Sequence, residues 1–342
     1  MNSVELEARR VVETTLVPHT AFEHAVKRIE QCFNYQDDAG EPICAAILGE
    51  SRTGKSRCLE ESFDRHRKVR TKEGLNVPIL RVKTPSKPTV KGLAELMLNA
   101  LDDPRSLSGT ENAKTLRLQK LMIGVGTRMV MIDEFQHFYD KGSHKIVHHV
   151  ADWLKVLVDD CRIALVVAGL PTCRDILAQN EQLSGRFLSP MMMPRFDWVN
   201  YESRGEFEAI LEAFYASISR HFSLPRLDTR EIAFRCYCGT GGLIGYLTKF
   251  LRQAVWNALD ARKTTIELSD LEQALDEAVW TGNTPVLYNN PFSRAFNATP
   301  TESLLSKVKK VGTRPEDEEL PEKPRRSAGR RRHDLSSVLK GN

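Results

Sequence analysis

The sequence lacks a long apolar run: nowhere do about 18 consecutive apolar residues occur, the length that a membrane-spanning helix needs. Its first ten residues, MNSVELEARR, carry acidic side chains where a secretory signal would have an apolar stretch. The seven cysteines are scattered, and only Cys236 and Cys238 lie close together, so the spacing supports neither a disulfide framework nor a metal cluster. We therefore expect a cytoplasmic protein whose cysteines are small buried apolar residues.

Most of the chain also lacks an excess of positive charge. The net charge is +4, and residues 301–342 alone hold 11 Lys and Arg against 7 Asp and Glu, so the rest of the chain is neutral overall. Any contact of the folded part with DNA therefore requires a local basic cluster. The basic stretch 325–332 is open to three roles, as a DNA contact, a partner contact or a tether.

Short apolar runs alternate with segments of helical periodicity up to about residue 198. The runs that predict buried strands are 43–48, 77–82, 129–132 and 163–168. Helical segments follow each of them, at 55 onward, 89–101, 112–123 and 147–158. This alternation predicts an α/β core over residues 43–198, with a parallel sheet flanked by helices.

The pattern changes after residue 198. Segments 202–222, 228–237, 243–259 and 269–279 have helical spacing with no convincing strand between them. They predict a small all-helical lid domain at 199–281. Residues 1–42 are expected to be an N-terminal extension with one amphipathic helix at 21–33. Residues 282–342 are rich in Pro, Asn, Ser and charge and predict a flexible, disordered basic tail for partner binding.

A phosphate-binding motif follows the first predicted strand. Residues 49–56, GESRTGKS, match GxxxxGK[ST] in full. Glycines let backbone N–H groups wrap phosphates, Lys55 reaches the β- and γ-phosphates, and Ser56 ligates Mg²⁺. The predicted nucleotide-binding residues are Gly49, Glu50, Ser51, Arg52, Thr53, Gly54, Lys55, Ser56 and Arg57.

A second motif is the apolar run 129–132, which ends in Asp133 and Glu134. Such a strand buries beside the phosphate loop, so Asp133 is expected near the Mg²⁺. Glu134 is expected to orient the attacking water as a general base, which favours hydrolysis over simple nucleotide binding. The Asn-Lys-x-Asp base reader of GTPases does not occur in the sequence, so ATP is the expected nucleotide.

Arg186 belongs to a third motif, the segment QLSGRF at 182–187, which comes just before the apolar run 191–193. Ring-forming ATPases place an arginine finger at this point, before the last strand of the sheet. Such a finger stabilises transition-state charge on the nucleotide of a neighbouring subunit. A surface arginine with no catalytic role is the alternative.

With these elements in place, the chain resembles the AAA+ transposition regulators of the TniB/TnsC group, which are related to the MuB target-selection protein. The resemblance extends from about residue 20 to residue 280. Beyond the generic motifs it is carried by PSKPTV at 85–90, RMVMIDEF at 128–135, and EQLSGRF at 181–187 leading into PMMMP at 190–194.

The resemblance implies an AAA+ ATPase that assembles on double-stranded target DNA as an ATP-dependent ring or helical filament, with hydrolysis as the disassembly switch. It implies a DDE transposase (TniA/TnsB-like) and a target selector (TniQ/TnsD-like) as partners, and leaves open whether that selector is CRISPR-associated. ATP and Mg²⁺ are the implied cofactors. Carried over by position, the implied catalytic residues are Lys55, Asp133, Glu134 and Arg186, and Ser56 and Asp133 would hold the Mg²⁺.

Two features depart from many AAA+ proteins. The end of the fourth core strand, Val167-Ala168-Gly169-Leu170, lacks a polar sensor residue, and the lid stretch 241–245 lacks a sensor arginine.

The segment after the second core strand usually faces the pore of such rings, so it is the predicted DNA surface. The residues assigned to backbone phosphate contact are Lys83, Lys87, Lys91, Lys114 and Arg117. A solvated basic face is the alternative reading of these residues. Two other classes of function also stay open, a helicase-loader or replication-initiator-like ATPase and a signalling ATPase.

Overall fold

The computed structural model describes residues 3–35, 40–72, 74–85, 88–140, 144–280 and 288–313. Residues Met1–Val311 cluster into one compact unit. Lys87 and the basic stretch 325–332 lie outside the described residues.

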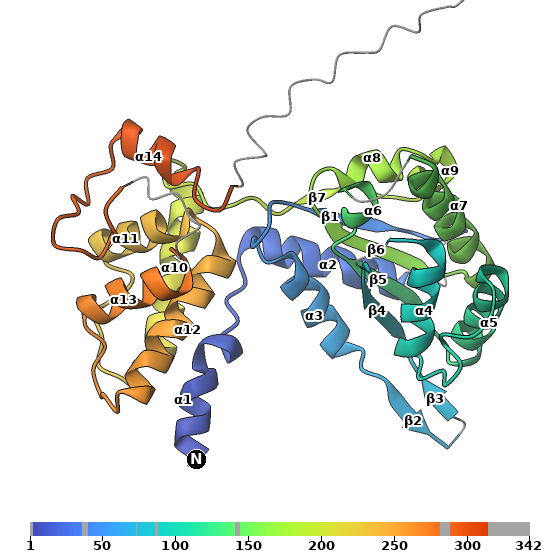
Figure 1. Ribbon diagram of the computed structural model, residues 1–342, viewed down its shortest axis with the longest axis horizontal. Helices are drawn as coiled ribbons and strands as arrows, with labels where there is room; N and C mark the ends of the chain where they lie inside the picture. Colours follow the sequence, from blue (N-terminus) through green and yellow to red (C-terminus); the bar gives the residue numbers. More distant parts are fainter. Residues whose placement is uncertain are drawn as a thin grey trace, which may run out of the picture. The chain divides into compact units, whose positions relative to one another are not determined.

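A five-stranded parallel sheet forms the centre of the first part of the chain (Figure 1). Its strands are β1 (Ala45–Leu48), β4 (Ile79–Lys83), β5 (Met129–Asp133), β6 (Ala164–Gly169) and β7 (Met191–Met192), in the order β4-β5-β6-β1-β7. Every residue of β1, β5 and β6 is buried. Strands covered on both faces need apolar residues throughout, so short unbroken apolar runs predicted them correctly.

Helices cover both faces of this sheet (Figure 1). On one face, α2 (Thr20–Asn34) and α3 (Lys55–Arg65) pack on alternate strand residues such as Ile47 and Met131. On the other face, the strand residues in between, such as Leu48 and Ile132, pack against α4 (Val90–Ala100), α5 (Glu111–Gly124) and α7 (His144–Cys161). The predicted α/β class is confirmed.

Several small elements were not expected from the sequence. An antiparallel hairpin of β2 (Val69–Thr71) and β3 (Gly74–Asn76) precedes β4. Three short helices follow β5 and β6: α6 (His137–Asp140), α8 (Cys173–Leu177) and α9 (Glu181–Ser184). Each of these elements is three to five residues long, too short to show a periodicity that a sequence pattern could reveal.

A second hydrophobic core joins the later helices. The four predicted ones are α10 (Tyr201–Ile218), α11 (Arg230–Thr240), α12 (Ile244–Asp260) and α13 (Leu268–Ala278). An unpredicted N-terminal helix, α1 (Ser3–Thr14), packs against α10 and α12. None of the helices in the described part of the chain has the length and apolarity that crossing a bilayer requires.

The chain after the lid also contributes to this second core. Phe292, Phe296 and Val308 are buried in it, and α14 (Glu302–Val308) packs against α11. The flexible segment predicted from residue 282 did not allow for this packing. The aromatic side chains bury enough apolar surface to hold residues 288–311 on the helices, despite their content of Pro, Asn and Ser.

Phe292→Ala tests whether this segment is part of the folded unit. The ring is buried and lies 5.2 Å from that of Phe250. We expect its removal to lower the free energy of unfolding by about 3 kcal/mol, because it leaves a cavity in the helical core. Urea unfolding followed by circular dichroism measures this. A loss below about 0.5 kcal/mol, the usual range of surface substitutions, would show that the segment does not pack there.

Candidate functional site

The turn between β1 and α3 has the backbone of an anion-binding loop. Gly54 precedes α3 with a φ of 98°, a left-handed conformation that residues with a Cβ rarely adopt. The first N–H groups of a helix have no partner within it, and no side chain caps α3 in their place. These N–H groups and the helix dipole favour a negatively charged group at this end. The buried hydroxyl of Thr53 donates to the carbonyl of Glu50 at 2.9 Å and closes the turn.

A cavity of about 560 Å³ opens at this turn. The predicted residues that line it are Ser51, Arg52, Gly54, Lys55, Ser56, Arg57 and Glu134. Gly49, Glu50, Thr53 and Asp133 are not part of its lining. Glu60, Arg81, Leu170 and Gly245 complete the lining and were not predicted. The structure therefore brings the phosphate motif and the acidic motif to one cavity.

Lys55 places its ammonium group within the loop itself. The Nζ atom donates to the carbonyls of Gly49 at 2.8 Å and Glu50 at 2.5 Å. Burial lowers the pKa of Lys55 below its ordinary value, and the nearby carboxylates of Glu134 and Asp133 oppose that shift. A phosphate at the loop would give this buried positive charge a stronger partner than two carbonyls.

Arg81 lies close to both predicted metal ligands, Asp133 and Ser56. The guanidinium of Arg81 lies 3.9 Å from Asp133 Oδ2 and donates to the backbone carbonyl of Ser56 at 3.4 Å. A buried carboxylate and a hydroxyl are oxygen ligands of the kind that Mg²⁺ prefers when phosphates and water complete its shell, so the pair fits this ion. Among the described residues, no cluster of three or more His, Cys, Asp and Glu forms an alternative metal site.

Glu134 sits on a tight turn that aims its carboxylate into the cavity. Its φ is 55°, and its backbone N–H donates to Asp133 Oδ1 at 2.9 Å. One carboxylate oxygen accepts a hydrogen bond from Gln136 Nε2, and the other lies 4.0 Å from Lys83 Nζ. A carboxylate that faces a cavity beside a phosphate loop can accept a proton from a water held there.

A second cavity, of about 410 Å³, shares Gly54, Arg57, Glu60 and Gly245 with the first. Its other lining is mostly apolar and comes from the segment before α2, from α2 itself, from α10 and from the start of α12: Leu16, Val17, Phe22, Ile210, Phe214 and Ile244. His19 also lines it, and burial lowers the pKa of its imidazole. An apolar pocket that continues a phosphate site suits a flat aromatic base.

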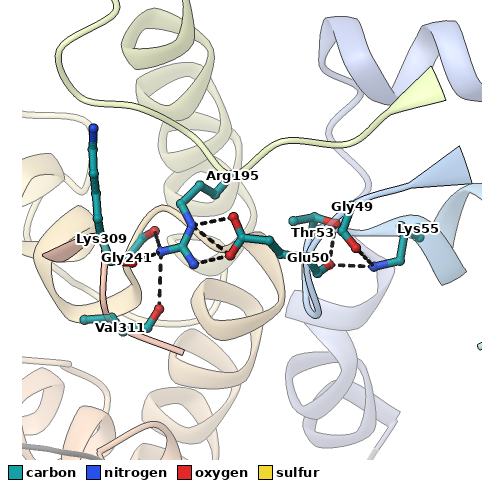
Figure 2. A network of polar contacts seen from close by, with 8 residues as sticks. All are labelled: Gly49, Glu50, Thr53, Lys55, Arg195, Gly241, Lys309 and Val311. Atoms are coloured by element: carbon teal, nitrogen blue, oxygen red, sulfur yellow. Dashed lines mark hydrogen bonds and ion pairs between the residues drawn. The ribbon is translucent and has the colours of Figure 1, made fainter. Parts of the chain in front are cut away.

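Arg195 joins the phosphate loop to the lid (Figure 2). Its guanidinium makes an ion pair with the carboxylate of Glu50. The same group donates to the carbonyls of Lys309 at 2.9 Å, and of Gly241 and Val311 at 3.3 Å each. One planar side chain thereby links the loop, the lid and the segment after α14. Sequence patterns did not indicate this residue, because its partners lie far away in the chain.

The loop touches the lid at a second point. The N–H of Gly245, at the start of α12, donates to the carbonyl of Arg52 at 2.8 Å. The guanidinium of Arg52 lies over the ring of Tyr246, 4.5 Å from its centroid. The shape of the loop therefore depends on the lid helices as well as on β1 and α3.

Arg186, the predicted trans-acting finger, is engaged within its own chain. Its guanidinium pairs with Asp159 of α7 at 2.6 Å and donates to the carbonyl of Gln182 at 2.8 Å. The side chain is only 16% exposed. In this arrangement the group holds the chain after α9 against α7.

One of the predicted DNA contacts, Lys114, is wrong. Its side chain is fully buried and donates to Glu95 Oε1 at 2.8 Å and to the carbonyl of Ser106 at 2.9 Å, so it cannot reach a phosphate backbone. Arg117 is partly exposed, pairs with Asp103 at 2.8 Å and donates to the carbonyl of Arg105 at 2.6 Å. Both side chains fasten the loop between α4 and α5.

Lys83 and Lys91 are exposed, as a DNA contact requires. Lys83, at the end of β4, is 69% exposed and is also the cation near Glu134. Lys91 lies in the first turn of α4. Among the residues that the structure describes, these two lysines are the exposed members of the predicted DNA surface.

Lys114→Ala tests the structural assignment. Removing a buried ammonium that satisfies a carboxylate and a loop carbonyl should lower the free energy of unfolding by about 2–3 kcal/mol. The matched control is Lys120→Ala, because Lys120 is exposed on the same helix. Chemical denaturation of both variants measures the effect. Equal stability of the two would contradict the assignment.

A family model described as bacterial TniB protein matches residues 8–198, which is more than half of the chain. No curated protein matches the sequence.

Solved structures of archaeal proteins share the fold. The Aeropyrum pernix ORC2 protein, solved as ADPNP–ADP complexes, is 16% identical, with a TM-score of 0.59 over 79% of this chain and 72% of that one. Cdc6p from Pyrobaculum aerophilum is 14% identical, with a TM-score of 0.57 over 78% and 70%. The Aeropyrum pernix ORC1 protein in complex with DNA is 14% identical, with a TM-score of 0.53 over 79% and 69%. Identities this low show a common fold only.

Proposed function

Because the chain belongs to the TniB family of bacterial proteins, we propose that it is an ATP-hydrolysing AAA+ protein that assembles on double-stranded DNA during transposition. The AAA+ fold is shown by the similarity to the ORC and Cdc6 structures. One observation carries the step from fold to activity: a single cavity is lined by the phosphate loop, by Lys55 and Ser56, and by Glu134.

In the proposed site the two cavities bind different parts of ATP. The triphosphate lies against the N–H groups of the loop and the first turn of α3, with Lys55 turned from the loop carbonyls to the β- and γ-phosphates. The adenine occupies the apolar cavity around Phe22 and Ile244. The ORC2 structure, which contains ADPNP and ADP, supports nucleotide binding by this fold.

Hydrolysis then requires a base and charge neutralisation. Glu134 accepts a proton from water as the water oxygen bonds to the γ-phosphorus and the bond to the β–γ bridging oxygen breaks, giving ADP and phosphate. Mg²⁺ held by Ser56 and Asp133 would neutralise charge on the phosphate oxygens. Arg81 adds a fixed positive charge beside these two residues.

Glu134→Gln tests the hydrolytic role. The amide keeps the size of the side chain but accepts no proton, so turnover of ATP should fall about 100-fold or more while ATP binding persists. Steady-state phosphate release and titration with a fluorescent ATP analogue measure the two quantities. Glu61→Gln is the control. Glu61 pairs with Arg65 on α3 and is not part of the cavity lining. Normal turnover in Glu134→Gln would remove the proposed base.

Assembly is proposed to bring a neighbouring protomer to the nucleotide, and Arg186 is the residue that the family resemblance assigns to that contact. For Arg186 to serve there, its guanidinium must leave Asp159 and the carbonyl of Gln182. Oligomerisation would then be coupled to release of the chain after α9 from α7.

The proposed DNA surface consists of Lys83 and Lys91, with Lys87 predicted to join them. The ORC1 structure in complex with DNA supports DNA association by a protein of this fold. Contacts of this kind neutralise phosphates, carry little sequence information and weaken as salt rises.

Lys91→Glu tests this surface without disturbing the cation near Glu134. We expect an affinity for duplex DNA about tenfold lower at low salt, and a shallower dependence of affinity on salt, because one phosphate contact becomes a repulsion. Lys120→Glu on α5 is the control. Fluorescence anisotropy with duplex DNA and an ATP analogue measures both. Equal affinity of the two variants would place the DNA elsewhere.

The proposed partners are a DDE transposase and a target selector, both in the bacterial cytoplasm. A replication-initiator or helicase-loader role is the alternative of the same fold. The family match favours transposition, whereas the ORC and Cdc6 similarities bear on fold alone. Binding of the chain to a DDE transposase encoded beside it would distinguish the two roles.

A further inference from the structure

The last residue of β6 is Gly169, and the space that a side chain there would need is occupied by other side chains. A Cβ on Gly169 would lie 2.5 Å from Gln136 Oε1 and 2.5 Å from Cys173 Sγ, far inside any normal contact. While Gln136 and Cys173 keep these positions, the polar residue that many AAA+ proteins carry at the end of this strand does not fit here. Its space belongs to the side chain of Gln136, which comes from the turn after β5.

The carboxamide of Gln136 is held at both ends. Its Oε1 atom accepts a hydrogen bond from the N–H of Leu170 at 3.2 Å, and its Nε2 atom donates to Glu134 Oε2. Only this orientation pairs each donor with an acceptor, since the carboxylate of Glu134 accepts and the N–H of Leu170 donates. With only 4% of its surface exposed, Gln136 has little room to adopt another rotamer.

The backbone around Gln136 is fixed to the sheet as well. The N–H of Phe135 donates to the carbonyl of Ala168 on β6 at 3.0 Å, and the N–H of Tyr139 donates to the carbonyl of Gln136 at 2.8 Å. Glu134 has a positive φ, a conformation that costs about 1–3 kcal/mol and persists only where neighbouring contacts maintain it. Its carboxylate borders the cavity and has Gln136 as its hydrogen-bond donor from a side chain.

We propose that Gln136 is a positioning residue for hydrolysis: it fixes the carboxylate of Glu134 at the cavity from the place where a polar residue of β6 would otherwise stand. This role rests on the proposed function, because it needs Glu134 to be the base. With Gln136 in this role, the chain does not need a polar side chain at position 169. Gln136 acts through Glu134 and through Leu170, which also lines the cavity.

Two substitutions test the role. Gln136→Glu keeps the size of the side chain and an acceptor for Leu170, but it sets a carboxylate against Glu134. Gln136→Met keeps the length and removes the donor. In both variants we expect turnover of ATP to fall about 10- to 100-fold, because the base is no longer fixed. Titration with a fluorescent ATP analogue should show dissociation constants within about threefold of the wild type, because binding depends on the loop.

Gln119→Glu is the matched control. Gln119 donates to Asp160 at 2.9 Å, so the same change again opposes two carboxylates, but away from either cavity. Its turnover should equal that of the wild type. Thermal unfolding of all variants separates a catalytic defect from a general loss of structure.

Each outcome decides the matter. Turnover at the wild-type rate in both Gln136 variants, with a wild type that hydrolyses ATP, overturns this role and leaves the proposed function intact. Loss of nucleotide binding in step with turnover and melting temperature shows a purely structural role and also overturns it. A wild type without turnover on DNA removes the proposed function, and the role of Gln136 with it.

Discussion

The position of β6 between β1 and β5 is the constraint on which the site depends. In a parallel sheet the carboxyl ends of all strands meet at one edge, so the loop after β1 and the acids after β5 face the same space. Two inter-strand spacings separate them, roughly 10 Å. Gly169, the last residue of β6, and Leu170 after it then lie between the loop and Glu134. The proposed contacts with the phosphates follow from that order of strands.

The lid contacts the phosphate loop at this edge of the sheet. Arg195 reaches the carboxylate of Glu50 and the carbonyls of Gly241, Lys309 and Val311, and Gly245 donates to the carbonyl of Arg52. A nucleotide that changes the shape of the loop would therefore shift the lid helices and the segment after α14 through these contacts alone. In an assembling ATPase, this couples the state of the nucleotide to surfaces that neighbouring protomers or partners meet.

Local patterns predicted much of the α/β core and of the phosphate loop, because buried parallel strands and glycine turns have clear local signatures. They failed where long-range contacts decide. Lys114 was assigned to DNA from its charge, yet it shares the buried face of α5 with Leu118 and Met122, four and eight residues later. That spacing is a signal of burial that the sequence did contain.

Other contacts had no local signal. Arg195 meets Glu50 and Arg186 meets Asp159 across long stretches of chain, so only the folded structure shows that these arginines are engaged. Gln136 is an intermediate case, since the missing polar residue at position 169 and an amide side chain two residues after Glu134 are both visible in the sequence. Only the structure shows that the side chain of Gln136 fills the space beside Gly169.

The account stands on the claim that backbone amides at the start of α3 hold the phosphates of ATP. The most direct measurement is an experimental structure of the chain with Mg²⁺ and a non-hydrolysable ATP analogue. We expect the phosphates against the amides of residues 52–56, with Lys55 Nζ within hydrogen-bond distance of the γ-phosphate. The adenine should lie in the cavity beside Phe22. A nucleotide bound at another place, or a saturating analogue that leaves this cavity empty, would contradict it.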